Sequence, residues 1–119
     1  MIKNKWIQWI LIALPALALL GSGFSKLAGT EQVVKGLTAL GVGPYITLIG
    51  VIEVVIVGLY LLPVTRNIGF FLICSYLGGA IIAHLAHGEP VTSPVVLLSF
   101  VWVVMFLTKP GLFLPSKPL

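Results

Sequence analysis

Three ionisable side chains lie within or beside long apolar stretches of the chain, where charged groups are rare. Glu53 stands near the middle of one stretch, about 12 Å along a helix from Tyr45. Lys26 closes an earlier stretch, and His84 lies near the end of a later one. An acid at the centre of a membrane-spanning helix costs about 2.5–3.5 kcal/mol on insertion scales, so it faces other helices and is protonated or paired. These residues predict a polar cluster inside a helical bundle.

The spacing of neighbouring polar residues extends this cluster. Ser22 lies one helical turn before Lys26, so both side chains project from one face. Tyr76 and His84 share a stripe of their helix. An ammonium, a carboxylate, an imidazole and two hydroxyls can hold a small polar ligand or relay protons. The predicted ligand-binding residues are Lys26, Glu53, His84, Tyr76 and Ser22, and no catalytic residue is assigned.

Each of these residues also has a purely structural interpretation, which the sequence leaves open. Glu53 could be a hydrogen-bonded acid that fixes helix register, and Lys26 could extend its ammonium to the membrane surface. His84 and His87, with only distant carboxylates, do not form a specific ligand set, so no metal site is predicted. Cys74 is the single cysteine, which excludes an intrachain disulfide.

The composition indicates which elements must position these side chains. Of the 119 residues, 59% are hydrophobic and 8% are charged, which is far from the range of soluble domains. Backbone groups in lipid must pair internally, so runs of this length must be helices. We therefore predict an all-α fold, one membrane domain over residues 1–119, with four transmembrane helices. The expected spans are residues 6–25, 45–62, 68–86 and 94–107.

Residues 30–40 have a different pattern, with Val33, Val34, Leu37 and Leu40 on one stripe and polar residues elsewhere. This predicts a short amphipathic helix at the membrane interface, between the first and second spans. The first span could instead be a cleaved signal peptide, which would leave three spans. Its apolar run exceeds the ~7–15 residues of a signal core, which favours a membrane span.

The charge distribution predicts the orientation. The formal net charge is +4, and the basic residues stand mainly at the ends of the apolar runs. This position is typical of topology signals and of contacts with lipid headgroups. We therefore do not expect nucleic acid as a partner. With four spans, one side of the membrane would carry more basic residues than the other: Lys3, Lys5, Arg66, Lys109 and Lys117 against Lys26 and Lys35. Both termini are therefore expected in the cytoplasm.

Three short motifs together resemble the DoxX-like family of membrane proteins. They are Gly23-Phe24-Ser25-Lys26-Leu27, Gly50-Val51-Ile52-Glu53 and Gly79-Ala80-Ile81-Ile82-Ala83-His84-Leu85. The resemblance implies a four-helix bundle in a bacterial-type inner membrane. It also implies an association with membrane redox and thiol homeostasis, because the family takes its name from a subunit of a thiosulfate:quinone oxidoreductase.

Three functions follow as hypotheses. The first is a subunit or accessory component of a membrane redox system, with an interior site for a quinone-like or other small ligand and a membrane or periplasmic redox partner. No haem, flavin or paired-cysteine motif occurs in the sequence, so a partner or a diffusible quinone would carry the electrons. The second is a structural or assembly protein whose polar cluster only fixes the bundle. The third is a proton-coupled carrier, which would need to form a homo-oligomer. Whether the chain is an enzyme stays open.

Overall fold

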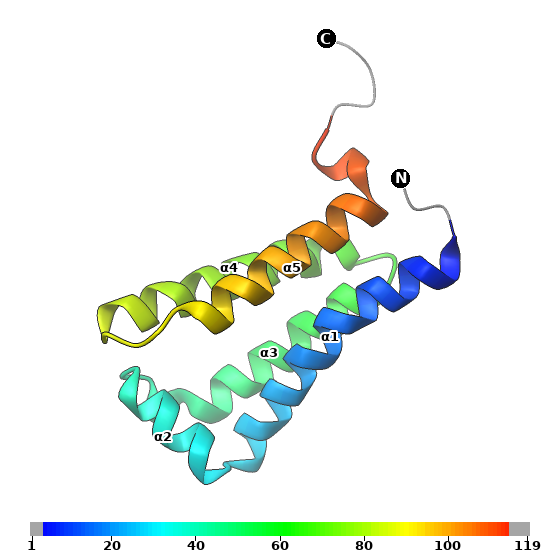
Figure 1. Ribbon diagram of the computed structural model, residues 1–119. Helices are drawn as coiled ribbons and strands as arrows, with labels where there is room; N and C mark the ends of the chain where they lie inside the picture. The colour runs from blue at the N-terminus through cyan, green and yellow to red at the C-terminus, as the bar shows by residue number, and fades with distance from the viewer. Residues whose placement is uncertain (1–3, 115–119) are drawn as a thin grey trace.

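The computed structural model describes residues 4–114, and in that range the chain is helical without a strand (Figure 1). Four long helices pack against one another, and a short helix joins the first two. Their bounds in chain order are α1 Lys5–Ala28, α2 Glu31–Ala39, α3 Ile46–Leu61, α4 Arg66–Ala86 and α5 Thr92–Thr108. Single turns of 3-10 helix at Gly43–Tyr45 and Pro110–Leu112 precede α3 and follow α5. The predicted all-α class is confirmed.

Three segments of the described chain are long and apolar enough to cross a membrane: Lys5–Ala28, Gly43–Leu61 and Arg66–Ala86. The fourth predicted span corresponds to α5, an apolar helix of 17 residues that is shorter than these. Large apolar side chains cover the outward faces, among them Leu17, Leu48 and Ile82. Surfaces of this kind are stable against lipid and unstable against water.

Helices α1 and α3 run antiparallel and approach closely where two glycines face each other. A Cβ atom on Gly50 would lie 3.1 Å from the carbonyl oxygen of Gly23 and 3.1 Å from Cβ of Lys26. A Cβ on Gly23 would lie 3.0 Å from the Val54 side chain. Small residues at such a crossing let two helix backbones come together. This contact fixes the register that sets Lys26 beside Glu53.

The turn between α3 and α4 is held by side chains that satisfy the last carbonyls of α3. Thr65 Oγ1 donates to the Leu59 carbonyl at 2.7 Å. Arg66 donates from Nε to the Tyr60 carbonyl at 3.0 Å and from Nη2 to the Leu61 carbonyl at 2.9 Å, and its guanidinium lies over the Trp9 ring. Carbonyls at a helix end need such partners. The turn therefore ties α1, α3 and α4 together at one end of the molecule.

The apolar core lies nearest this end. Phe70, Trp102 and Phe113 form an aromatic group there, with ring centroids 4.9–5.7 Å apart. The largest fully buried side chains of the apolar core are Leu19, Val57, Tyr60, Phe70, Ile73, Val101, Val104 and Met105. Trp102 packs against Phe70 and Phe113 and is half-exposed.

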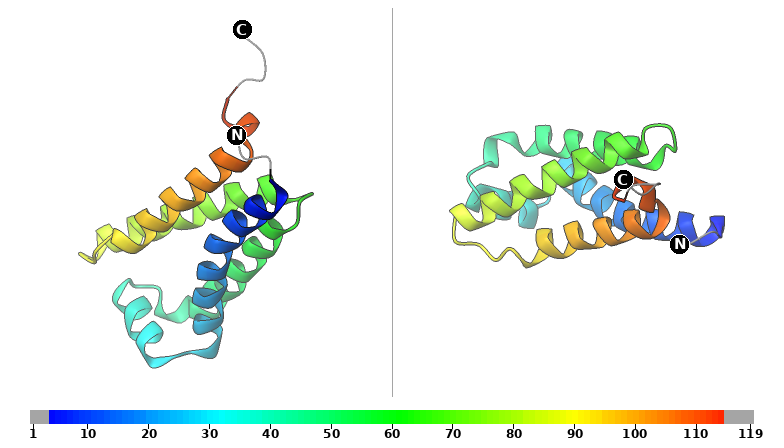
Figure 2. Two further views of the ribbon diagram at one scale, coloured as in Figure 1. Left: turned by 45° about the vertical axis from the view of Figure 1, so that its right-hand side comes forward. Right: turned by 90° about the horizontal axis from the view of Figure 1, so that it is seen from above.

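The opposite end of the bundle is more open. Figures 1 and 2 show the α1–α3 pair diverging from the α4–α5 pair toward α2, which lies across the end of α1 and α3. Helix α2 has no buried residue, and it is bounded by Gly29 and Gly41, both at positive φ, a backbone conformation that glycine adopts without strain. The predicted helix over residues 30–40 is thus present, and its place at a membrane interface stays a prediction.

Candidate functional site

An ion pair between α1 and α3 lies at the base of this opening. Lys26 Nζ is 2.7 Å from Glu53 Oε2, and the two side chains are only 10% and 2% exposed. Lys26 therefore extends into the bundle, and the alternative in which its ammonium reaches the membrane surface is wrong for this structure. A buried pair of this kind must be completed by further hydrogen bonds, because desolvation of two charges is costly.

Two hydroxyl groups supply those hydrogen bonds. Ser22 Oγ accepts from Lys26 Nζ and lies 3.4 Å from Glu53 Oε2. Tyr76 on α4 donates its hydroxyl to the same carboxylate oxygen at 3.1 Å. Lys26, Ser22 and Tyr76 therefore converge on Oε2, and none of these bonds engages Oε1. The structure thus brings four of the five predicted residues into one hydrogen-bonded cluster.

His84 belongs to the same region without bonding to the ion pair. Its ring nitrogen Nδ1 lies 2.6 Å from the carbonyl oxygen of Ala80, one turn earlier on α4. A carbonyl oxygen can only accept, so Nδ1 carries a proton and donates it. Nε2 is then the nitrogen that remains for other contacts.

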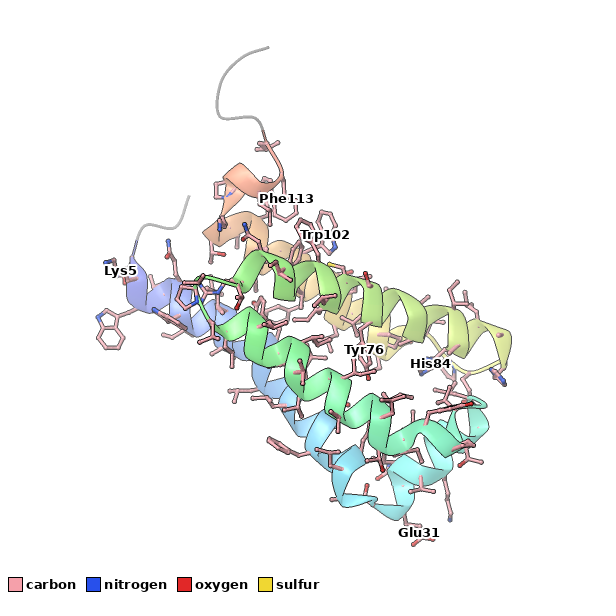
Figure 3. The ribbon with its side chains drawn as sticks, turned by 180° about the vertical axis from the view of Figure 1, so that it is seen from behind. Lys5, Glu31, Tyr76, His84, Trp102 and Phe113 are labelled. Atoms are coloured by element: carbon pink, nitrogen blue, oxygen red, sulfur yellow. The ribbon has the colours of Figure 1, made fainter. Side chains whose placement is uncertain are left out.

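The side chains line a partly open hollow of about 120 Å³ between α1, α3, α4 and α5. It is lined by Leu19, Ser22, Lys26, Glu53, Tyr76, Leu77, Ala80, His84, Ser93, Pro94 and Leu97. Lys26 and His84 also line two larger hollows, of about 290 and 300 Å³, that lie toward α2. Figure 3 shows Tyr76 and His84 on the side of α4 that faces α3 and α2. The polar cluster therefore borders a series of hollows that share Lys26 and His84.

Several residues around these hollows were not predicted. Leu37 of α2 and Leu40, directly after α2, form an apolar wall over the outer hollows, and Glu89 places a carboxylate at the rim beside Lys26 and His84. Their signals in the sequence were the apolar stripe of residues 30–40 and one acid after the third span. Ser93 and Leu97 line the inner hollow from α5, and nothing in the sequence marked them as site residues.

The arrangement combines hydrogen-bonding groups with an apolar surround. Lys26 has three N–H groups, of which two are directed to Ser22 and Glu53. Within the described part of the chain, the third has no protein acceptor. Together with Nε2 of His84, this leaves a donor and a second polar atom available to a bound molecule. Sites of this composition, largely apolar with a few converging polar groups, are typical of small-molecule pockets.

In the comparison with protein families, the model of the DoxX-like family matches residues 10–107. Neither the curated proteins nor the solved structures contained a match to the chain. The matched range includes Lys26, Glu53 and His84 and most of the four long helices. The family match and the three long apolar helices together indicate a membrane protein. Because the family model covers well over half of its residues, this chain belongs to the DoxX-like family.

Proposed function

We propose that the protein binds a small, lipid-soluble, quinone-like ligand at the Lys26–Glu53 cluster and serves as a subunit or accessory component of a membrane redox system. The observation that carries this proposal is the position of the ion pair. Lys26 and Glu53 are buried, and they border hollow space instead of being enclosed by side chains on all sides. A cluster with a purely structural role needs no such space, and in a bundle of this size close packing would be more stable.

The hollows together have room for a ring-sized polar group. A cavity of about 150 Å³ holds a benzene ring. The inner hollow, at about 120 Å³, is smaller than this, so part of the ring would lie in the neighbouring hollows of about 290 and 300 Å³. The larger hollows beside α2 would accept the substituents of such a ring. When bound, a quinone and its hydroquinone form would supply a two-electron redox couple. The protein's own residues would bind and orient the ring through Lys26 and His84.

The proposal includes a location: four spans in a bacterial-type cytoplasmic membrane, with both ends of the chain in the cytoplasm. Three basic residues, Lys5, Arg66 and Lys109, lie at one end of the bundle, where Lys109 Nζ donates to Asn67 Oδ1 at 2.8 Å. Cytoplasmic loops are enriched in such residues. Helix α5 is about 26 Å long at ~1.5 Å per residue, so it would span a slightly thinned bilayer. Helix α2 would lie at the opposite interface.

The test is retention of a lipophilic ligand during purification from the membrane. We expect organic extracts of the purified protein to contain a quinone or its hydroquinone form, and the amount to fall at least fivefold in His84→Leu and in Glu53→Gln. His87→Leu is the matched control. His87 lies one turn further along α4 and makes the same kind of bond, from Nδ1 to the Ala83 carbonyl, but lines none of these hollows.

Two results would contradict the proposal. One is a wild-type protein that carries no ring-containing lipophile above the level found in an unrelated membrane protein purified in parallel. The other is equal retention in wild type, His84→Leu and Glu53→Gln, with all three folded as judged by circular dichroism. That second result would assign the cluster to structural support of the bundle.

A further inference from the structure

The hydrogen bond from His84 to Ala80 restricts what the site can recognise. Nδ1 must donate, because its partner is a carbonyl oxygen 2.6 Å away. In a neutral imidazole the second nitrogen, Nε2, then carries a lone pair and no proton. His84 is half-buried and lines the inner hollow and both outer ones. A neutral His84 thus presents an acceptor to a bound molecule.

Lys26 presents the complementary group. Its ammonium can only donate, and two of its three N–H groups are directed to Ser22 and Glu53. The third N–H is available to a ligand, because the Lys26 side chain lines the same three hollows as His84. A ligand atom that meets both residues must therefore donate to one and accept from the other. A hydroxyl group does both, whereas a carbonyl or ether oxygen can only accept.

Resting on the proposed function, we infer that His84 is a specificity-determining residue that selects ligands bearing an aromatic hydroxyl, the phenol or hydroquinone class, over the corresponding carbonyl or ether compounds. The hydroxyl donates to His84 Nε2 and accepts from Lys26 Nζ. An ether in the same place leaves the imidazole acceptor without a partner in a desolvated site, which is costly.

The inference is tested with a pair of probes that differ only in this group, para-heptylphenol and its methyl ether, para-heptylanisole. Their dissociation constants are measured by titration calorimetry on the full chain in lipid nanodiscs, at a pH of about 8, where an ordinary imidazole is neutral. We expect the phenol to bind about tenfold more tightly, and His84→Leu to remove that difference while His87→Leu keeps it.

The outcomes separate this inference from the proposed function. Equal affinity for phenol and ether in wild type would overturn the selection by hydroxyl and leave the ligand site standing. Binding of neither probe would overturn both. Nitrogen NMR of isotope-labelled histidine in the wild-type protein supplies a readout that needs no variant. A His84 ring protonated on Nδ1 alone supports the inference, and a ring protonated on Nε2 overturns it.

Discussion

Replacing Lys26 by methionine removes the ammonium group and keeps most of the side chain's length and apolar volume. Glu53, with 2% of its side chain exposed, then loses its cation and keeps only neutral donors. Breaking a buried ion pair from one side costs about 3–5 kcal/mol. We expect about 3 kcal/mol here, at the low end, because Tyr76 and Ser22 still donate to the carboxylate and the hollow admits water. Glu53→Gln should cost a similar amount by leaving Lys26 without its anion.

The double variant, Lys26→Met with Glu53→Gln, should cost far less than the sum. Both charges are gone, and the amide oxygen of glutamine can still accept from Tyr76. We expect about 3 kcal/mol for the double variant against about 6 for additive effects, a coupling energy of about 3 kcal/mol. The assay is reversible unfolding by sodium dodecyl sulfate in bicelles, followed by tryptophan fluorescence.

The chain provides a matched control for this cycle. Lys35 and Glu31 on α2 form an ion pair at 3.2 Å, but their side chains are 77% and 83% exposed. An exposed pair one helical turn apart contributes about 0.3–0.5 kcal/mol. The same cycle on this pair should give a coupling energy below about 0.5 kcal/mol. If Lys26 and Glu53 show coupling as small as this control, the argument from a buried ion pair is refuted.

Three further predictions follow from the packing and the topology. Gly50→Ala should lower the free energy of unfolding by about 1–2 kcal/mol, since its Cβ would lie 3.1 Å from the α1 backbone. Gly58→Ala is the control, because a Cβ there meets open space, and it should be neutral or stabilising in the same bicelle assay. A larger loss in Gly58→Ala than in Gly50→Ala would contradict the close crossing of α1 and α3. Arg66→Lys should cost about 1–2 kcal/mol, because a lysine cannot reproduce both bonds to the end of α3; an unchanged unfolding midpoint would show that these bonds contribute nothing. The topology is tested in a chain whose native cysteine is replaced by serine. There, Gln32→Cys should react with a membrane-impermeant maleimide added to intact spheroplasts, whereas Val64→Cys, at a position 95% exposed in the α3–α4 turn, should react only after lysis. The opposite labelling would show that the proposed topology is inverted.

The positions of the long helices could largely be predicted from the sequence, because backbone groups in lipid must pair internally and a long apolar run must therefore be a helix. The apolar runs at 45–62 and 68–86 correspond to α3 Ile46–Leu61 and α4 Arg66–Ala86. The first helix extends further than predicted, to Ala28, because the turn that contains Lys26 continues the helix into the bundle. Apolar periodicity could not show this extension, since a lysine normally marks the end of a span.

Only part of the candidate site could be predicted from the sequence. A central acid in an apolar run needs a partner, and the helical spacing of Ser22 and Lys26 identified one. The exact register of α1 against α3 depends on the glycine contact between Gly23 and Gly50, a matter of packing that spacing alone does not reveal. The tautomer of His84 depends on one local bond to Ala80 and likewise needs coordinates.

Glycines of the long helices differ from one another in how closely a neighbouring helix approaches them. Gly50 lies at a close crossing, whereas a Cβ on Gly58, Gly78 or Gly79 would meet no atom within 4 Å. The sequence gives all four the same residue type in similar apolar surroundings. Only the direction in which each faces, set by the pairing of whole helices, separates a contact glycine from one on an open face.

A density map of the protein purified from its native membrane, at a resolution that shows ordered water, tests the central claim most directly. The account predicts non-protein density in the hollow between Glu53 and His84, continuous toward α2, with a polar atom within hydrogen-bonding distance of both Lys26 Nζ and His84 Nε2. A hollow closed by side-chain packing, or filled by water alone in a sample never stripped of lipid, would contradict it.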